Sequence, residues 1–306
     1  MWPQYLQQIQ QGDTKALARC ISLVENEAAG YEDLMKRLPL SSTPVIGITG
    51  PPGAGKSTLV DALINLLVGK EKKVGVLCVD PSSPFNLGAL LGDRIRMSEW
   101  YNHPNVFIRS LATRGSLGGL HPKIIEITDL IKAAPFDFII VETVGVGQSE
   151  IEIAGLADVT IVTVVPEAGD EIQTMKAGLM EIADIFVVNK SDRPDADLFV
   201  KNLRMMLAPA FHTKQQAIPI IKTIASQKEG IEELLNAIIG NTTNLPTGQA
   251  GDQRPTTKNK RHWLLAEKAW HLIQQKRMTD INKEELKRKI EAAGNNFNLY
   301  SFIQTF

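Results

Sequence analysis

The residues with the clearest chemical potential in this sequence form a glycine-rich run between positions 50 and 57. The run reads Gly50-Pro51-Pro52-Gly53-Ala54-Gly55-Lys56-Ser57, and Thr58 follows it. In such a run, backbone N–H groups converge on phosphate oxygens, the lysine ammonium reaches the β- and γ-phosphates, and the serine hydroxyl ligates Mg²⁺. We therefore expect a nucleoside triphosphate site with cofactor contacts from Gly50, Gly53, Ala54, Gly55, Lys56, Ser57 and Thr58.

Three acidic residues are candidates for holding the magnesium ion together with Ser57. Asp80 and Glu142 each follow a short apolar run directly, whereas Asp93 follows a loop. Carboxylates at the ends of neighbouring parallel strands meet at the edge of the sheet where a phosphate loop lies, and carboxylate oxygen is a preferred Mg²⁺ ligand. Acidic residues at such positions also cap helices, and the pattern favours Asp80 and Glu142 over Asp93.

The segment that begins with Glu142 has the spacing of the DxxG element of GTPases, with glutamate in place of aspartate. In that element the carboxylate orders Mg²⁺-bound water and the glycine N–H, here Gly145, senses the γ-phosphate. Together with Lys56 and Asp93, Glu142 is a candidate catalytic residue. Val146 occupies the position where many small GTPases carry a water-orienting glutamine, so we expect slow intrinsic hydrolysis. Four arginines precede Glu142 and are candidates for charge on the γ-phosphate or for surface ion pairs: Arg94, Arg96, Arg109 and Arg114.

The tetrapeptide Asn189-Lys190-Ser191-Asp192 bears on the choice of base. An aspartate carboxylate accepts two hydrogen bonds, and guanine offers a suitable N1–H and N2–H₂ pair that adenine lacks. Asp192 therefore predicts GTP, with Asn189 and Lys190 beside it in the binding loop. Ala225 follows the last apolar run, and its backbone is a candidate contact for the guanine O6.

These residues need a scaffold, and the apolar pattern predicts an α/β domain. Seven short runs rich in Val and Ile indicate strands buried on both faces, at 45–49, 74–79, 106–109, 138–141, 159–165, 185–188 and 218–221. Longer stretches between them indicate crossover helices at 56–68, 122–133, 174–182 and 231–239. The fold class that follows is a P-loop NTPase with a mostly parallel central sheet flanked by helices.

Helical extensions are expected on both sides of this domain, which we place at residues 44–240. In the N-terminal extension, residues 1–43, Asp13 is positioned to cap a helix that carries Leu17, Ile21 and Val24 on one stripe. The C-terminal part, residues 241–306, begins with a polar linker and continues with a helical arm. The apolar stripe of this arm needs a cover, either the parent domain or a second copy, because it carries Trp263, Ala266, Trp270 and Ile273.

Composition excludes several function classes. The 306 residues are 43% hydrophobic and carry a formal net charge of −1, which gives no global reason to expect nucleic acid or an anionic membrane as a partner. No run approaches the length of a membrane span, and Cys20 and Cys78 are too far apart in sequence for a CxxC site. A cytoplasmic protein is the expectation.

The chain resembles the MeaB/ArgK family of SIMIBI-class GTPases in motifs spread from about residue 42 to residue 230. They are Gly50–Ser57, Asp80–Ser83, Leu91–Met97, Arg114–Leu120, Glu142–Glu150, Gly169–Gln173 and Asn189–Asp192. The resemblance implies a homodimeric G protein, with GTP or GDP and Mg²⁺, that serves as chaperone to an adenosylcobalamin-dependent acyl-CoA mutase, usually methylmalonyl-CoA mutase. It also implies phosphate and metal roles for Lys56, Ser57, Asp80, Asp93 and Glu142, and a mutase-facing switch at Pro166–Lys176.

The chain departs from the family pattern at three positions. Leu87 stands where members commonly have the first residue of a Gly-Gly pair, Glu167 replaces a glycine, and Ile224 replaces the serine of a Ser-Ala pair. Glu167 places a carboxylate beside the proposed mutase-facing switch, which bears on partner choice.

Three alternative functions stay open at this point. A P-loop ATPase or kinase linked to amino-acid transport would prefer ATP, and Asp192 argues against it. A metal-delivery GTPase needs clustered soft or imidazole ligands, and neither the cysteines nor the five histidines form a close tract. A GTP-binding scaffold without hydrolysis is compatible with Val146.

Overall fold

The fold is available as a computed structural model that describes residues 2–80, 97–113, 120–143, 149–167, 177–211 and 218–243, and residues 262, 264–266, 268–270 and 272–274. The chain divides into two compact units, Met1–Arg261 and His262–Phe306. The division into residues 1–43, 44–240 and 241–306 stays a prediction.

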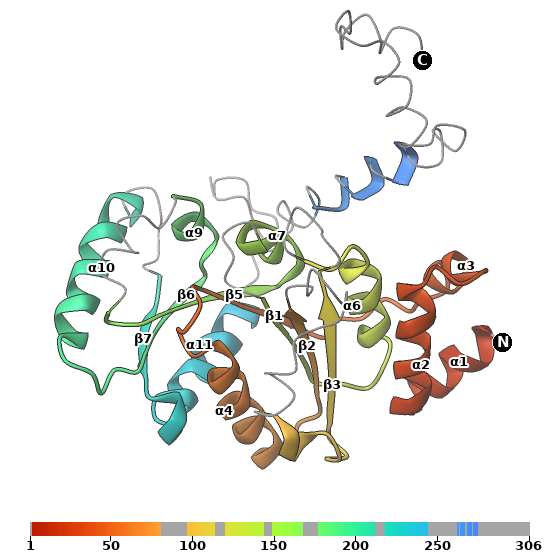
Figure 1. The fold of residues 1–306 in the computed structure, drawn as a ribbon, viewed down its shortest axis with the longest axis horizontal. Coiled ribbons are helices and arrows are strands. Elements are labelled where there is room, and N and C mark those ends of the chain that lie inside the picture. Colours follow the sequence, from red (N-terminus) through yellow and green to blue (C-terminus); the bar gives the residue numbers. More distant parts are fainter. Residues whose placement is uncertain are drawn as a thin grey trace, which may run out of the picture. The chain divides into compact units, whose positions relative to one another are not determined.

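A seven-stranded sheet forms the centre of the first unit, and each pair of neighbouring strands runs parallel. The strand order is β3-β2-β4-β1-β5-β6-β7 (Figure 1). The strands are β1 Val45–Thr49, β2 Val74–Asp80, β3 Val106–Ala112, β4 Phe138–Glu142, β5 Val159–Val164, β6 Ile185–Asn189 and β7 Ile220–Thr223. The predicted fold class is confirmed, and β1 lies between the two strands, β4 and β5, whose ends frame the start of the phosphate loop.

Helices cover both faces of the sheet. On one face lie α4, Lys56–Gly69, and α11, Ile231–Thr243 (Figure 1). On the other face lie α6, α7, α9 and α10, which span Ile124–Lys132, Ser149–Leu156, Ala177–Ile182 and Ala196–Phe211. The crossovers between parallel strands therefore supply two helical layers, as expected for this class.

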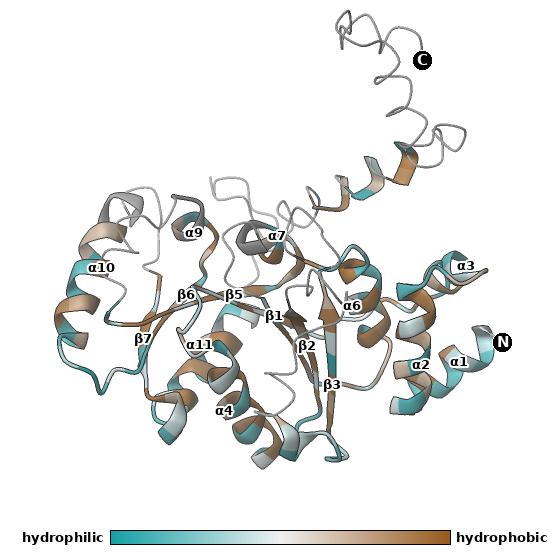
Figure 2. Cartoon of the chain, viewed as in Figure 1, coloured by the Kyte–Doolittle hydropathy of each residue, from teal (hydrophilic) through white to brown (hydrophobic). Residues whose placement is uncertain are grey.

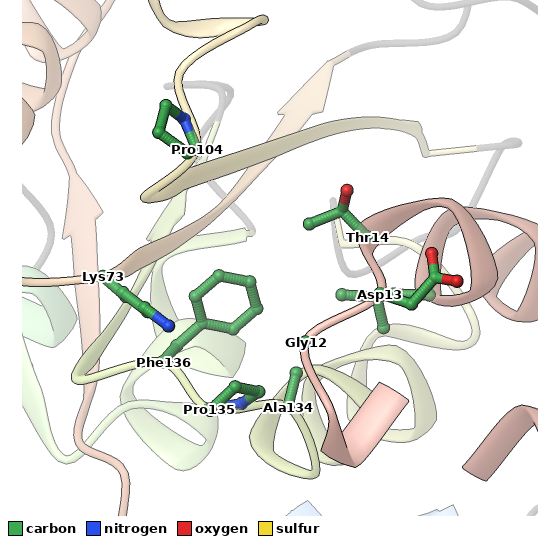
Figure 3. A pocket seen from close by; sticks show the side chains of 9 residues that line it. Gly12, Asp13, Thr14, Lys73, Pro104, Ala134, Pro135 and Phe136 are labelled. Atoms are coloured by element: carbon green, nitrogen blue, oxygen red, sulfur yellow. The ribbon is translucent and has the colours of Figure 1, made fainter. Parts of the chain in front are cut away.

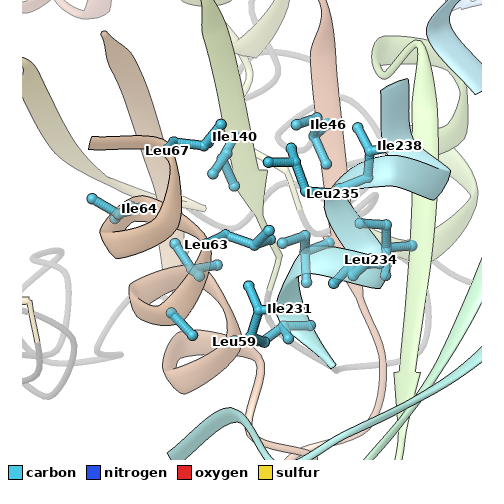
Figure 4. Close-up of a cluster of buried hydrophobic side chains, with 14 of the residues drawn as sticks. Ile46, Leu59, Leu63, Ile64, Leu67, Ile140, Ile231, Leu234, Leu235 and Ile238 are labelled. Atoms are coloured by element: carbon cyan, nitrogen blue, oxygen red, sulfur yellow. The ribbon is translucent and has the colours of Figure 1, made fainter. Parts of the chain in front are cut away.

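The main core lies between the sheet and the pair α4 and α11. Leucines and isoleucines of both helices pack on apolar side chains of β1 and β4 (Figure 4). The buried side chains are Ile46, Leu59, Leu63, Leu67, Ile140, Ile231, Leu234, Leu235 and Ile238. The strands are hydrophobic along their central residues (Figure 2) because they are buried on both faces. Burial of each such side chain contributes about 1.5–3 kcal/mol, which fixes α4 and hence the phosphate loop that precedes it.

The N-terminal helices α1, Trp2–Gln10, α2, Thr14–Glu25, and α3, Tyr31–Met35, belong to the same compact unit as the sheet. Asp13 caps α2 as predicted, and its carboxylate accepts hydrogen bonds from the backbone N–H groups of Lys15 and Ala16. Leu17, Ile21 and Val24 are buried, so the predicted apolar stripe of this helix is confirmed.

Ion pairs attach these helices to β3 and α6. The guanidinium of Arg109 pairs with Glu25 and donates to the Ser22 hydroxyl at 3.0 Å. The buried ammonium of Lys123 pairs with Glu27 at 2.7 Å and donates to the Tyr31 hydroxyl at 3.0 Å. Although burial opposes the charge, these partners raise the pKa of Lys123 above its usual value. Arg109 thus forms a structural ion pair, while Arg94, Arg96 and Arg114 lie outside the described residues.

The described part of the second unit is helical, and several of its apolar residues are exposed, with Trp270 at 61% and Ile273 at 47%. Among the residues that the structure describes, no helix combines the length and apolar composition that a bilayer span requires.

Candidate nucleotide-binding site

Residues 50–55, the phosphate loop, connect the end of β1 to the start of α4. Gly50 has φ +139°, and a β-carbon there would lie 2.0 Å from the Thr163 carbonyl oxygen of β5. Gly55 has φ +84°, and a β-carbon there would lie 2.4 Å from Nδ2 of Asn189. Only glycine fits at these two contacts. The loop therefore leaves the sheet tightly against β5 and presents the N-terminus of a 14-residue helix, which favours anions.

The side chain of Lys56 folds back over the phosphate loop. Its ammonium donates to the carbonyl oxygens of Gly50 and Pro51 at 2.8 and 3.0 Å, and the residue is 8% exposed. A buried cation at the N-terminus of a helix is an electrostatic arrangement that favours a polyphosphate.

Ser57 and Glu142 lie together, as the metal-site prediction requires. The Ser57 hydroxyl donates to Oε1 of Glu142 at 2.7 Å, and the two residues are 7% and 5% exposed. A hydroxyl and a carboxylate oxygen side by side in a dry environment are hard oxygen donors that fit Mg²⁺. The backbone of Asp80 ends β2 at the same edge of the sheet, where Cys78 pairs in register with Glu142. Asp93 and Gly145 lie outside the described residues.

Asn189 connects the phosphate loop to the end of β7 and the residues that follow it. Its Nδ2 donates to the Ala54 carbonyl at 2.9 Å, and its Oδ1 accepts hydrogen bonds from the Thr223 hydroxyl and the Ala225 N–H, both at 3.1 Å. The side chain is buried and fully engaged with its neighbours. The contact of Ala225 with guanine O6 stays a prediction, and in this structure its N–H donates to Asn189.

The turn after β6, residues 190–193, is the candidate base-binding loop. The ammonium of Lys190 donates to the Gly53 carbonyl at 2.8 Å, and Lys190 has φ +55°. Asp192 is exposed, so its carboxylate is accessible to a base. Arg193 forms an ion pair with Glu167 in the turn after β5. Burial opposes the charge of Glu167, but the hydrogen bond and charge of Arg193 hold its pKa below the ordinary value of 4.5.

Several contacts in the site escape sequence reasoning because their partners are distant along the chain. Thr143 donates from its hydroxyl to the Thr49 hydroxyl at 2.9 Å. Trp100, in the 3₁₀ turn Ser98–Trp100, donates from Nε1 to Asp61 of α4 at 2.7 Å. Together with the Glu167 pair, these contacts connect residues that no short motif links, and the sequence carries no local signal for them.

A small pocket lies at the opposite, amino-terminal edge of the sheet (Figure 3). Its lining comes from the start of α2 and from residues that precede β2, β3 and β4: Gly12, Asp13, Thr14, Leu17, Lys73, Pro104, Ala134, Pro135 and Phe136. Its volume of about 30 Å³ is far below the roughly 300–1,000 Å³ of typical ligand pockets, so it is too small for a nucleotide. Among the described residues, no cluster of three or more His, Cys, Asp or Glu side chains is arranged to hold a metal ion.

A parallel sheet whose first strand runs into a glycine-rich loop and a helix, with Glu142 against Ser57, defines a P-loop nucleoside triphosphatase domain. A family model described as methylmalonyl-CoA mutase-associated GTPase MeaB matches residues 17–282. The chain therefore belongs to the MeaB family of GTPases, as the sequence motifs predict.

Individual relatives agree with this assignment. A putative GTPase of Pyrococcus horikoshii is 47% identical over 239 residues, which cover 76% of this chain and 75% of that protein. A fused isobutyryl-CoA mutase of Geobacillus kaustophilus is 37% identical over 238 residues, which cover 72% of this chain and 22% of that protein. Among solved structures, a LAO/AO transport system kinase superposes with a TM-score of 0.69 at 27% identity and covers 99% of this chain and 95% of that chain.

Proposed function

We propose that this GTPase is a chaperone that couples its nucleotide state to cofactor loading and protection of an adenosylcobalamin-dependent acyl-CoA mutase, with methylmalonyl-CoA mutase as the first candidate. The observation that carries the proposal is the relative in which a matching segment shares one polypeptide with an acyl-CoA mutase. A domain that is fused to an enzyme in one protein commonly contacts the same kind of enzyme when it is a separate chain. The family description names the same class of partner.

We call the phosphate loop, Lys56, Ser57 and Glu142 the phosphate half of the proposed site. This half binds the triphosphate through backbone N–H groups of the loop and through Lys56. Ser57 and Glu142 would hold Mg²⁺, together with Asp80 at the end of β2 and with Asp93. When bound, the metal ion neutralises charge that develops on the phosphate oxygens. Glu142 is the best supported of these acidic residues, because its carboxylate is buried and already hydrogen-bonded to Ser57.

We call residues 189–193 the base half of the site, and in this proposal they select guanine. The exposed carboxylate of Asp192 accepts from guanine N1–H and N2–H₂. Lys190 and Asn189 hold its loop against the phosphate loop through the carbonyls of Gly53 and Ala54. Base and phosphates are therefore read by two loops that are hydrogen-bonded to each other.

Hydrolysis is proposed to be slow in the isolated protein and faster with its partner, because Val146 stands where a water-orienting glutamine is common. A slow intrinsic rate suits a checkpoint, in which the triphosphate state persists until the mutase is correctly loaded. We further propose a homodimer in which the helical arm contacts a second copy, since Trp270 and Ile273 leave apolar surface exposed.

The test measures GTP hydrolysis by the full chain alone and after titration with methylmalonyl-CoA mutase or isobutyryl-CoA mutase, each with and without adenosylcobalamin. The cognate mutase should accelerate hydrolysis at least about tenfold, because partner-supplied groups complete many GTPase sites. The Lys56→Ala variant should show no acceleration. The chaperone proposal fails if neither mutase changes the rate and neither co-elutes with the chain in GDP or in a non-hydrolysable GTP analogue.

A further inference from the structure

Two buried threonines meet at the point where the phosphate loop leaves the sheet. Thr49 is the last residue of β1 and directly precedes Gly50, and Thr143 directly follows Glu142 at the end of β4. The Thr143 hydroxyl donates to the Thr49 hydroxyl at 2.9 Å. Thr49 is 0% and Thr143 is 1% exposed, so this hydrogen bond is shielded from water.

The hydroxyl bond lies beside the last backbone contact that the described residues of β1 and β4 make. Ile48 pairs in register with Glu142, and the Thr143 N–H donates to the Ile48 carbonyl at 3.0 Å. The side-chain bond adds a second connection between the two chains at the residue where the phosphate loop begins.

Two consecutive residues, Glu142 at the end of β4 and Thr143 directly after it, hold both ends of the phosphate loop. Side chains alternate between the two faces of a strand, so Glu142 and Thr143 point in opposite directions. Glu142 reaches Ser57 on α4 at 2.7 Å, at the far end of the loop, while Thr143 reaches Thr49 at its near end. Two hydrogen bonds, one at each end of residues 49–57, thus connect this stretch to the consecutive residues Glu142 and Thr143.

Packing alone does not explain why both positions carry hydroxyls. Both residues are buried, and a pair of valines would have nearly the same shape as the two threonines. A buried hydroxyl destabilises the fold unless it is paired, whereas replacement of both partners by apolar groups is close to neutral. The two hydroxyls therefore fix the relative orientation of the two chain segments, because a hydrogen bond is directional and an apolar contact is not.

We propose that the Thr49–Thr143 hydrogen bond positions the Glu142 carboxylate relative to the phosphate loop and thereby sets the Mg²⁺-dependent part of nucleotide binding and hydrolysis. This inference rests on the proposed metal role of Glu142. Thr49 and Thr143 are positioning residues that act through Glu142.

The experiment compares Thr49→Val, Thr143→Val, the double variant and Thr143→Ser with the wild type. Two properties are measured on the full chain: the thermal midpoint without nucleotide, and the affinity for GDP first in EDTA and then with Mg²⁺. Thr143→Val should lower the midpoint because the Thr49 hydroxyl loses its donor, and the double variant should recover it. Thr49→Val should lower the midpoint less, because the Thr143 hydroxyl still has the Ile48 carbonyl at 3.5 Å. In all three, the gain in affinity on addition of Mg²⁺ should shrink about tenfold, while affinity in EDTA changes less than about twofold.

Thr143→Ser keeps the donor and should retain the wild-type response to Mg²⁺. A matched control is Thr128→Val, which removes another buried threonine hydroxyl, on α6 and outside the phosphate loop and β4. It should leave the response to Mg²⁺ unchanged. The inference is overturned if the double variant recovers stability and also shows the wild-type gain with Mg²⁺. If the wild type itself gains no affinity with Mg²⁺, the proposed metal site fails instead, whatever the threonine variants do.

Discussion

The two halves of the nucleotide site differ in how far their side chains are exposed to solvent. The functional side chains of the phosphate half are buried, since Lys56, Ser57 and Glu142 are each less than 10% exposed. The base half is exposed at Asp192 and Arg193, and it is attached by ion pairs and by single hydrogen bonds to backbone carbonyls. Asn189 belongs to both halves, because it is buried and bonds to the phosphate loop as well as to Ala225.

This contrast separates what each half can control. In a dry environment a charge-assisted hydrogen bond is strong and its geometry is fixed, so the phosphate half suits charge stabilisation. Exposed charges interact weakly and are screened by salt, so the base half suits selection and exchange of the nucleotide. We therefore expect substitutions in the phosphate half to have large effects and those in the base half to have graded ones.

The largest effect is expected from Lys56→Ala. Loss of the buried ammonium should weaken GTP binding about 10²–10³-fold, measured by calorimetry with Mg²⁺ present. The matched control is Lys70→Ala, which removes an exposed ammonium paired with Glu232 just after the end of the same helix. The control should bind GTP like the wild type. Unchanged GTP affinity in Lys56→Ala would contradict the phosphate role of this half.

The next largest effect is expected from Asp192→Asn in the base half. An amide presents a donor where the carboxylate accepted, so preference should move from GTP toward xanthosine triphosphate. The relative affinity should change roughly 10- to 100-fold, since hydrogen bonds to a charged group contribute about 1.5–3 kcal/mol.

Competition between the two nucleotides measures the shift in preference caused by Asp192→Asn. Asp197→Asn, at another exposed carboxylate, is the control and should leave preference unchanged. Retained preference for GTP in Asp192→Asn would remove the case for guanine recognition by this residue.

An intermediate effect is expected from Gly55→Ala, which changes the contact between the phosphate loop and Asn189. Gly53 and Gly55 both have positive φ, so alanine is strained at either position, but only at Gly55 would the new β-carbon collide with Asn189. Gly55→Ala should therefore cost about 1 kcal/mol more than Gly53→Ala, or roughly 3 °C in thermal midpoint. Calorimetric unfolding without nucleotide measures the difference. Equal midpoints for the two variants would show that the Asn189 contact is not under strain.

Sequence reasoning located the sheet well because the central strands are buried on both faces and consist of Val and Ile. It failed at the edges. The edge strand β3 runs to Ala112, three residues beyond the expected end, because its half-buried residues Arg109 and Ser110 interrupt the apolar pattern. The other edge strand, β7, begins at Ile220 instead of 218, after Pro219, which has no N–H to donate to a ladder.

The same limit applies to the site. Lys56 and Ser57 could be found because the phosphate loop is one continuous motif with a fixed relation to a strand and a helix. Glu142 could be found because strand ends converge at one edge. The Thr49–Thr143 bond and the Glu167–Arg193 pair could not, since each joins residues on different elements whose separation only the folded sheet determines.

The smallest effect is expected from the exposed pair of Glu167 and Arg193, which links the base-binding loop to the turn after β5. Exposed pairs contribute about 0.2–1 kcal/mol, so Arg193→Ala should speed GDP release at most about fivefold. The pKa of Glu167 is lowered by its partner, so the pair contributes fully above the ordinary value of 4.5 and is lost as pH falls through the lowered value. GDP release by the wild type should therefore approach that of Arg193→Ala at acid pH or in high salt.

Stopped-flow release of a fluorescent GDP analogue, measured across pH and salt, tests this pair. Glu167→Gln should match Arg193→Ala, and Arg193→Lys should fall between them and the wild type. The charge-reversed double variant Glu167→Arg with Arg193→Glu should restore slow release if attraction between the two turns is what matters. If both single variants release GDP at the wild-type rate at neutral pH and low salt, the ion pair does not contribute to retention of the nucleotide. The base half is then held by hydrogen bonds, among them those of Asn189 and Lys190 and the bond from the Ser191 N–H to the Thr223 carbonyl, and it should be no more sensitive to salt than the buried phosphate half.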